Sequence, residues 1–249
     1  IYRRKYDTHM RIVLKALKSI DKNDKYYWAM FKSIYGRILV KKNRYEEALR
    51  HLEESAEILE QLQEYEGLMP TLNNIGVIYS SYYYDIEKAT DYFEKNLHIC
   101  QRINNLYFMS FNYNNLAEMC RERDKYKESL DYYNKALETL NKSPNKYSEI
   151  ITYVNLSYVN MALEDYKKSL RCIEKAEEIL NESKDIGEAI QCYYNYKAMF
   201  YYKMGYFQKA MSYAQKSVDM CISWGREADI EASYIILLCK SMLYKDLDY

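Results

Sequence analysis

The sequence predicts an all-α protein made of repeated helix hairpins, and three observations support this fold class. The 249 residues include only six glycines and two prolines, too few for the many tight turns of an all-β protein. Hydrophobic residues make up 49% of the chain and charged residues 29%, a balance typical of amphipathic helices. A small residue also recurs every 40 or 41 residues, at Gly36, Gly76, Ala117, Ser157 and Ala198.

Each small residue is followed by the same residue types at fixed distances. Gly36 is followed 9, 12, 16 and 19 residues later by Tyr45, Ala48, Leu52 and Ser55. A small residue lets two helices approach closely, and the aromatic residue fills the gap at the turn between them, so each repeat is expected to be one hairpin. Three later repeats keep these distances with Tyr126, Ser129, Tyr133 and Ala136, with Tyr166, Ser169, Ile173 and Ala176, and with Phe207, Ala210, Ala214 and Ser217.

Several glycines carry structural expectations of their own. The repeat of Gly76 has one extra residue, which predicts a bulged turn within residues 80–85. Gly76 itself is expected to face the second helix of its hairpin, so that leucine there destabilises the fold and alanine is mild. Gly67, Gly187 and Gly225 stand where second helices are expected to end, in left-handed caps.

These residues resemble the tetratricopeptide repeat family. Tyr-Glu-Glu-Ala at residues 45–48 and Tyr-Lys-Glu-Ser at residues 126–129 are good examples of its pattern at the start of the second helix. The resemblance covers roughly residues 29–224 and implies a right-handed superhelical solenoid of helix hairpins. An unrelated amphipathic bundle has no reason to repeat these distances five times. The period exceeds the family's ~34 residues and is similar to that of bacterial peptide-pheromone regulators and repeat-containing signalling proteins.

The register predicts a single array over residues 1–249. Because the chain begins at Ile1 without a methionine, we expect it to be a fragment of a larger protein. Terminal helices are expected at both ends, where a solenoid needs a cap or a further domain. The predicted parts are a partial N-terminal helix in 1–25, repeats in 29–68, 69–106, 107–146, 147–187 and 188–224, and a C-terminal helix or cap in 225–249.

Charge and composition exclude several classes of partner. Thirty-six basic residues balance 36 acidic ones, so there is no net charge to hold a phosphate backbone, and nucleic acid is not expected as a direct partner. Charged residues interrupt every apolar stretch before the ~20 residues of a membrane span, and no signal segment is visible. The six cysteines are widely spaced without a C-x-x-C pair, which indicates a reducing, cytoplasmic location.

No pattern in the sequence points to catalysis, a cofactor or a metal ion. The three histidines, His9, His51 and His98, are expected on separate outer helices, exposed or half-buried, and too far apart to share a site. Phosphate-binding loops, dinucleotide fingerprints and metal-spaced Cys and His clusters do not occur. We therefore expect a protein that is not an enzyme.

The register also predicts which residues line a groove for a ligand. Stacked hairpins place their first helices on the concave wall. Asn74, Asn115 and Asn155 stand two positions before the small residue in three consecutive repeats, and Tyr196 holds this position in the fifth. An amide side chain can donate to and accept from the backbone of an extended peptide. In peptide-binding members of the family asparagine at this position holds the ligand main chain, which the resemblance implies here.

Alternatives remain open for these positions. The asparagines are equally compatible with hydrogen bonds to the neighbouring helix or to water. Phe111 and Ile151, six positions before the small residue, fit either the groove floor or the core between repeats. Arg37, Glu118 and Tyr158, one position after it, are the predicted flanking groove residues.

One known ligand mode of the family is disfavoured. Adaptors that clamp an acidic C-terminal tail carry a lysine or arginine one turn before the groove asparagine, where this chain has Pro70, Phe111 and Ile151. The 31 tyrosines include the runs 82–84, 193–194 and 201–202, which either form a protein interface or reflect biased composition.

The sequence therefore predicts a cytoplasmic peptide-binding or protein-binding module without cofactors. We interpret it as the regulatory or sensory part of a bacterial signalling or transcription-control protein. The alternative is a structural scaffold whose ends and tyrosine-rich surfaces drive self-association or assembly of a multidomain protein. Homo-oligomerisation is compatible with both interpretations.

Overall fold

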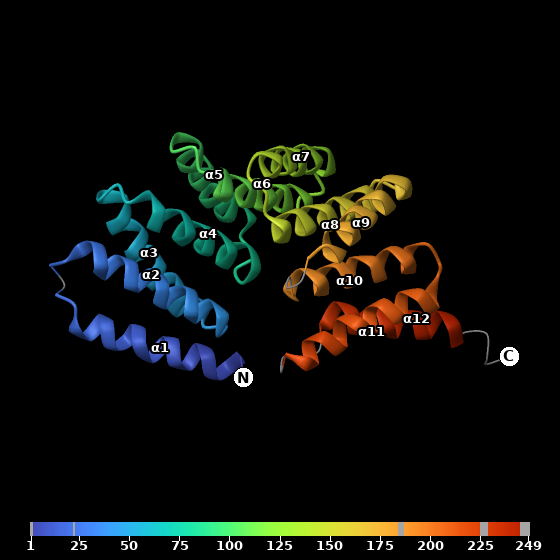
Figure 1. Cartoon of the computed structure of the whole chain (residues 1–249), viewed down its shortest axis with the longest axis horizontal. Helices are drawn as coiled ribbons and strands as arrows, with labels where there is room; N and C mark the ends of the chain where they lie inside the picture. Colours follow the sequence, from blue (N-terminus) through green and yellow to red (C-terminus); the bar gives the residue numbers. More distant parts are fainter. Residues whose placement is uncertain (1, 22, 184–186, 225–228, 245–249) are drawn as a thin grey trace. The chain divides into compact units, whose positions relative to one another are not determined.

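The part of the chain that the structure describes consists of helices joined by short turns. The computed structural model describes residues 2–21, 23–183, 187–224 and 229–244, and these residues contain helices and no strand. The all-α fold class is therefore confirmed (Figure 1). The chain forms two compact units, Ile1–Lys125 (unit 1) and Tyr126–Tyr249 (unit 2).

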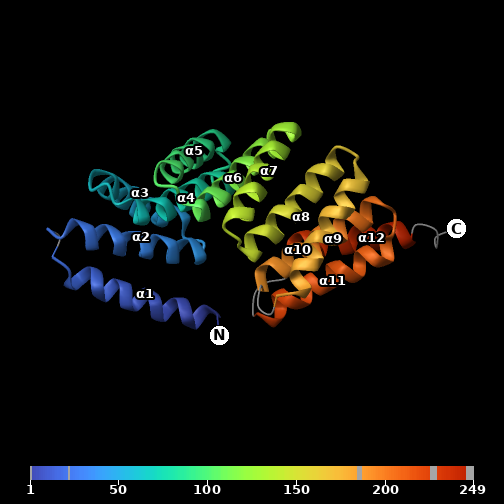
Figure 2. The same ribbon diagram turned by 45° about the horizontal axis from the view of Figure 1, so that its top comes forward.

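In unit 1, helices that follow one another in the chain pack against one another (Figures 1 and 2). Two of the pairs, α2 with α3 and α4 with α5, are the predicted hairpins. Helices α2, α4 and α6 also form a row, because α4 contacts both α2 and α6. The helices of this unit are α1 (Tyr2–Ser19), α2 (Lys25–Lys41), α3 (Tyr45–Gln61), α4 (Tyr65–Ser81), α5 (Ile86–Arg102) and α6 (Leu106–Arg121).

Unit 2 is built in the same way. The hairpins are α8 with α9 and α10 with α11, while α7 packs against α8 and α12 packs against α10 and α11. Here the row consists of α8, α10 and α12. The helices are α7 (Tyr126–Lys142), α8 (Lys146–Ala162), α9 (Tyr166–Asn181), α10 (Gly187–Lys203), α11 (Phe207–Ser223) and α12 (Ile230–Tyr244).

Polar residues before several helices explain where those helices begin. The carboxylate of Asp85 accepts a hydrogen bond of 3.0 Å from the backbone N–H of Lys88, in the first turn of α5. Asn105 caps α6 in the same way, with 3.1 Å to the N–H of Phe108. Such side chains satisfy backbone donors that have no partner within the helix.

The repeated small and bulky positions form the centre of each repeat. Two polar members bind the first helix of their own hairpin: the Ser55 hydroxyl donates to the carbonyl of Ala29 at 2.7 Å, and the Asn96 amide donates to that of Met69 at 3.0 Å. The predicted register is therefore confirmed. The buried positions are Gly36, Ala48, Leu52 and Ser55; Gly76, Ala89, Phe93 and Asn96; Ala117, Ser129, Tyr133 and Ala136; Ser157, Ser169, Ile173 and Ala176; and Ala198, Ala210, Ala214 and Ser217.

Close approach of the two helices explains the small residues. A Cβ atom added to Gly36 would lie 2.6 Å from Cγ of Leu52, and one added to Gly76 would lie 2.6 Å from Cε1 of Phe93. In the α8 and α9 hairpin the hydroxyls of Ser157 and Ser169 lie 2.8 Å apart. This contact argues against a mild effect of alanine at position 76, because even one methyl group overlaps the buried Phe93 ring unless the ring shifts.

Gly76→Ala is expected to lower the free energy of unfolding by about 1–2 kcal/mol, since the Phe93 ring must shift within a filled core. Gly187→Ala is the matched control. A Cβ atom at Gly187 would come no closer than 3.4 Å to Trp224, and alanine favours helix over glycine. Chemical denaturation should therefore show a loss for the first variant and none for the second. Equal unfolding midpoints for the two variants would contradict the packing at Gly76.

The glycine caps predicted from the sequence are wrong at two positions. Gly67 lies in the first turn of α4, where a Cβ atom would meet the sulfur of Met30 at 2.6 Å, and Gly187 begins α10. Gly225 lies outside the described residues. The left-handed backbone occurs instead in the turns themselves, mostly at residues that are not glycine: Asn43, Gln63, Tyr84, Asn104, Asp124, Glu164 and Gly205.

The extra residue of the second repeat lies in the predicted turn. Helix α4 ends at Ser81 and α5 begins at Ile86, and Tyr84 adopts the left-handed conformation between them with a φ of 54°. The bulged turn within residues 80–85 is therefore confirmed.

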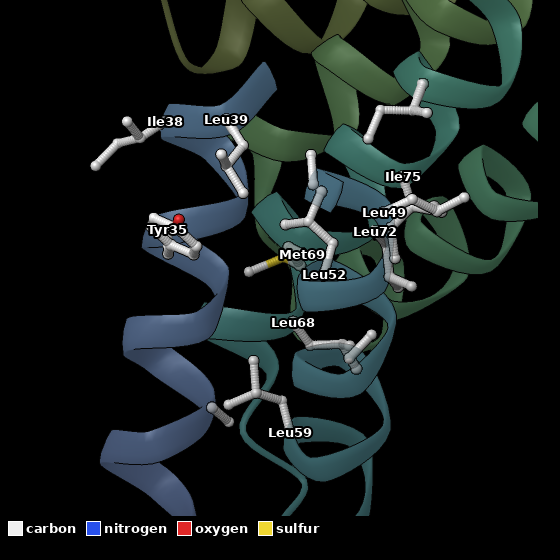
Figure 3. Packing of buried hydrophobic residues seen from close by; sticks show 14 of the residues in the cluster. Tyr35, Ile38, Leu39, Leu49, Leu52, Leu59, Leu68, Met69, Leu72 and Ile75 are labelled. Atoms are coloured by element: carbon white, nitrogen blue, oxygen red, sulfur yellow. The ribbon is translucent and has the colours of Figure 1, made fainter. Parts of the chain in front are cut away.

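The core of unit 1 is a continuous layer of aliphatic side chains between consecutive helices. Leu39 from α2, Leu52 from α3 and Leu72 from α4 are buried in one cluster, and Figure 3 shows them with Met69 in the space between these helices. Burial of each such side chain stabilises the fold by about 1.5–3 kcal/mol relative to leaving it exposed. This packing holds α2 and α4 side by side, and those two helices carry much of the candidate site.

Candidate peptide-binding pocket

A cavity of about 630 Å³ lies in unit 1. This volume is within the range of ligand pockets in proteins. Four helices supply its lining: α1, and the row of α2, α4 and α6. The lining residues are His9, Ile12, Val13, Ile34, Arg37, Ile38, Lys41, Pro70, Asn73, Asn74, Tyr107, Phe108 and Phe111.

The pocket combines apolar walls with a few polar groups. Isoleucines of α1 and α2 and aromatic residues of α6 provide the apolar surface. The polar groups are the His9 imidazole, the cations of Arg37 and Lys41, and the amides of Asn73 and Asn74. A mostly apolar concavity with a few placed polar groups is the usual form of a binding site.

The two asparagines of α4 differ in their hydrogen bonds. The Asn74 amide donates to the carbonyl of Pro70 in the preceding turn at 2.6 Å. The Asn73 amide oxygen accepts a hydrogen bond of 2.8 Å from the amide of Asn115 on α6. Each side chain thus uses one end of its amide in a hydrogen bond within the protein, and each is only half-buried. Asn115 itself is not among the lining residues, and its hydrogen bond holds Asn73 in position.

Glu118 and the residues of unit 2 lie outside this pocket. Glu118 on α6 pairs with Arg121, 2.6 Å away, and does not line the cavity. Asn155 on α8 is only 8% exposed. The rings of Tyr158 and Tyr196 meet edge to face, with centroids 6.1 Å apart, on the neighbouring helices α8 and α10. The structure thus gathers Arg37, Asn74 and Phe111 from the predicted set, with Asn115 adjacent.

The sequence does not predict the contribution of α1 to the cavity. His9 is exposed, as the sequence predicts, but α1 packs on α2, and His9, Ile12 and Val13 line the cavity. No repeat pattern extends to α1, so the register gave no signal for its inner face. On α2, Ile34 stands two positions before Gly36, the position that predicts groove residues, and Ile38 and Lys41 follow it at the helical spacing of a single face. The other lining residues that were missed are Asn73, Tyr107 and Phe108.

His51, His98 and the cysteines are not among the residues that line the pocket. His51 is half-buried, with its ring edge-on to that of Tyr35 at a centroid distance of 4.9 Å, and burial lowers its pKa. His98 is exposed on α5. Burial raises the pKa of the Cys100 thiol to about 12 and that of Cys192 to about 11, so both stay protonated near neutral pH.

The tyrosine runs behave differently from one another. Tyr82, Tyr83 and Tyr84 are exposed at the turn between α4 and α5. Tyr193 is buried, and Tyr201 stacks on Tyr213 with centroids 5.5 Å apart. Packing therefore explains much of the later runs.

The described part of the chain has neither a metal-binding cluster nor a membrane-spanning helix. Among its residues no three His, Cys, Asp or Glu side chains are grouped so that they could hold a metal ion. Within the same residues, no helix combines the length and the apolar character that crossing a membrane requires.

Comparison with known proteins agrees with this architecture. Residues 108–182 match the family model described as tetratricopeptide repeat. A search of curated protein sequences finds no match to the chain.

Solved structures resemble the chain over most of its length. The apo form of RapI has a TM-score of 0.70 at 16% identity, covering 98% of this chain and 95% of RapI. A Rap protein complexed with Competence and Sporulation Factor has a TM-score of 0.68 at 16% identity, covering 95% of this chain and 69% of the other. BtubC from P. vanneervenii has a TM-score of 0.65 at 17% identity, covering 89% and 90%.

The family model and the structural matches describe the same unit, a helix hairpin that packs on the next one. At these identities the solved structures show the fold alone. The resemblance to peptide-pheromone regulators is thus confirmed for the fold. Residues 108–182 match the tetratricopeptide repeat family in sequence, and the hairpins on either side share the fold of the solved structures.

Proposed function

We propose that this chain is a cytoplasmic, non-catalytic module that binds an extended peptide or protein segment in the pocket of unit 1. We further propose that it is the regulatory or sensory part of a bacterial signalling or transcription-control protein. The observation that carries the first proposal is the cavity of about 630 Å³, which joins apolar walls to half-buried amides on the inner row of helices. Helical-repeat proteins use such surfaces for binding.

The polar groups of the pocket suit a peptide backbone. Asn73 and Asn74 lie on α4, between the helices that carry the apolar walls. An extended segment that crosses this row presents backbone N–H and C=O groups to the amides and alternate side chains to the walls. The fold likeness to a Rap protein crystallised with Competence and Sporulation Factor supports a sensory role.

Filling the pocket tests the proposal. Ile34 lines the cavity and is 36% exposed, so Ile34→Trp is expected to occupy the cavity without disturbing the core. Ile103, which is 38% exposed and lies outside the lining, gives the matched control Ile103→Trp. The unmodified chain and the control are expected to enrich the same peptides from a random library, and Ile34→Trp to lose them. If Ile34→Trp enriches the same peptides as the unmodified chain, the pocket is not the binding site.

The alternative function, self-association as a scaffold, is favoured by one observation. Ile230, Tyr234 and Leu237 are exposed along a single face of α12, at the spacing of successive helical turns. Assembly through this face does not involve the pocket. Under this alternative, Ile34→Trp leaves self-association in sedimentation experiments unchanged, and no peptide enrichment depends on the cavity.

A further inference from the structure

Positive charge and aromatic surface occupy different helices of the pocket. Arg37 and Lys41 lie one turn apart on α2, and α1 adds His9 beside them. Tyr107, Phe108 and Phe111 come from α6. Helix α4 contacts both α2 and α6 and so separates the two groups. A ligand that crosses the row meets cations over α2, amides over α4 and aromatic rings over α6.

The two pocket cations of α2, Arg37 and Lys41, differ from the charged residues around them. Their neighbours are paired: Lys42 with Asp7, Arg44 with Glu47, and Lys32 with Glu54. No ion pair to Arg37 or Lys41 occurs among the residues that the structure describes, and no acidic side chain lines the pocket. Like charges one turn apart on a helix repel each other. This end of the pocket therefore attracts anions.

We infer that the pocket selects a peptide segment with acidic side chains at the end over α1 and α2, and an apolar side chain at the end over α6. This inference rests on the proposed function and names the class of its ligand. A chain terminus supplies only one carboxylate, and Arg37 and Lys41 carry two positive charges, so at least one partner is an aspartate or glutamate side chain. Arg37 and Lys41 are exposed at the pocket, and exposed charges steer and select partners of opposite sign.

The fold sets the distance between the two ends of the ligand. Packed helices lie about 8–10 Å apart, so α2 and α6 are separated by about 16–20 Å across α4. An extended chain advances about 3.3 Å per residue, which places the acidic and apolar ends about five or six residues apart. The mode differs from the family's clamp for acidic tails, because Pro70 stands one helical turn before Asn74 and the cations come from α2.

Selection from a random hexapeptide library, displayed between glycine-serine linkers so that no free terminus is present, tests this inference. The bait is the full chain in four forms: unmodified, Arg37→Glu with Lys41→Glu, Lys25→Glu with Arg50→Glu, and Ile34→Trp. Lys25 and Arg50 are exposed residues of unit 1 outside the lining, so the third form changes net charge equally. Thermal melts establish that every form is folded.

The unmodified chain and the Lys25 and Arg50 variant are expected to enrich Asp or Glu at one end and aromatic or aliphatic residues at the other. The Arg37 and Lys41 variant is expected to enrich Lys or Arg at the acidic end, and to bind the original acidic peptides at least about tenfold more weakly. Because exposed charges are screened, raising the salt from 0.05 to 0.5 M should weaken acidic peptides more than their Gln counterparts.

Two other outcomes distinguish the selection of acidic peptides from the proposed peptide binding on which it rests. Peptides that are lost with Ile34→Trp but carry no acidic residue, or that bind the charge-reversed chain equally well, would overturn the inference and leave the peptide pocket intact. Peptides that bind Ile34→Trp and the unmodified chain equally would overturn both.

Discussion

Glu177→Ala is expected to lower the free energy of unfolding by about 3 kcal/mol, the largest loss of stability that we expect from one surface carboxylate. The Lys197 side chain is only 7% exposed, and its Nζ lies 2.9 Å from both carboxylate oxygens of Glu177. It also donates to the Tyr193 hydroxyl at 2.6 Å and lies 4.7 Å from the centroid of the Tyr213 ring. Removing Glu177 leaves this ammonium group buried without a counter-charge.

Replacing Lys197 is expected to lower the free energy of unfolding by a different amount from replacing Glu177. Lys197→Met removes the charge and keeps most of the apolar volume, and Glu177, which is 44% exposed, can then turn to water. We expect a smaller loss than for Glu177→Ala. Glu178→Ala is the matched control, because Glu178 is exposed and pairs only with exposed Lys175, so the expected cost is below about 1 kcal/mol. A Lys197→Met variant less stable than Glu177→Ala would contradict the role of charge compensation.

The contribution of Glu177 to the stability of the fold is expected to decrease in acid. Burial raises the pKa of Glu177, but the hydrogen bond and charge of Lys197 outweigh burial and hold the pKa below its usual value. A carboxylate whose pKa is lower in the folded state contributes stability above its unfolded pKa and loses it as the pH falls through the folded value. The stability difference between the unmodified chain and Glu177→Ala should therefore shrink in acid. Denaturation series at neutral pH and near pH 3 measure this.

Replacing Asn73, Asn74 and Asn115 together by alanine is expected to weaken peptide binding by about one to two orders of magnitude without unfolding the protein, because Asn73 and Asn74 line the pocket and Asn115 holds Asn73. Each hydrogen bond to a ligand backbone contributes about 0.5–1.5 kcal/mol net, and every 1.4 kcal/mol is a factor of ten in affinity. The variant should stay folded because all three side chains are only half-buried. Calorimetric titration with a peptide selected on the unmodified chain measures the affinity, and a thermal melt checks the fold.

Asn155→Ala provides the comparison for this triple variant. The sequence groups Asn155 with Asn74 and Asn115, but it lies in unit 2 and is nearly buried, so the pocket model predicts unchanged affinity for it. Loss of fold in the triple variant would make the amides structural. A folded triple variant with unchanged affinity would place peptide binding outside this pocket.

The repeat register could be predicted from the sequence because packing imposes it directly. Positions such as Gly76 and Ala48 tolerate only small residues, because the two helices of a hairpin touch there. The recurrence of small residues in the sequence therefore indicates where the helices touch. The glycine caps could not be predicted, because left-handed backbone is also open to Asn, Asp and other residues in a turn, as Asn43 and Glu164 show. Gly67 instead makes room for Met30.

The pocket could be predicted only in part for a related reason. Its wall on α2 and α4 follows the repeat register, which led to Arg37 and Asn74. The wall on α1 follows no repeat, and His9 therefore carried no signal. Whether Asn155, Tyr158 and Tyr196 contact a ligand depends on surfaces of unit 2 that periodicity alone does not define.

The order of helix contacts also has a consequence for how the chain folds. Within each unit, the described helices pack on helices one or two places away in the chain. Contacts between residues close in sequence carry a small loop-closure entropy, so folding of the hairpins should be fast for a chain of this length. Folding can start at any hairpin and spread to its neighbours, as expected for arrays in which each repeat stabilises only the next. Within unit 1, α1 packs on α2, whereas α4 packs on α2, α3, α5 and α6. We therefore expect α1 to open before α4 in local unfolding, and α1 forms one wall of the pocket.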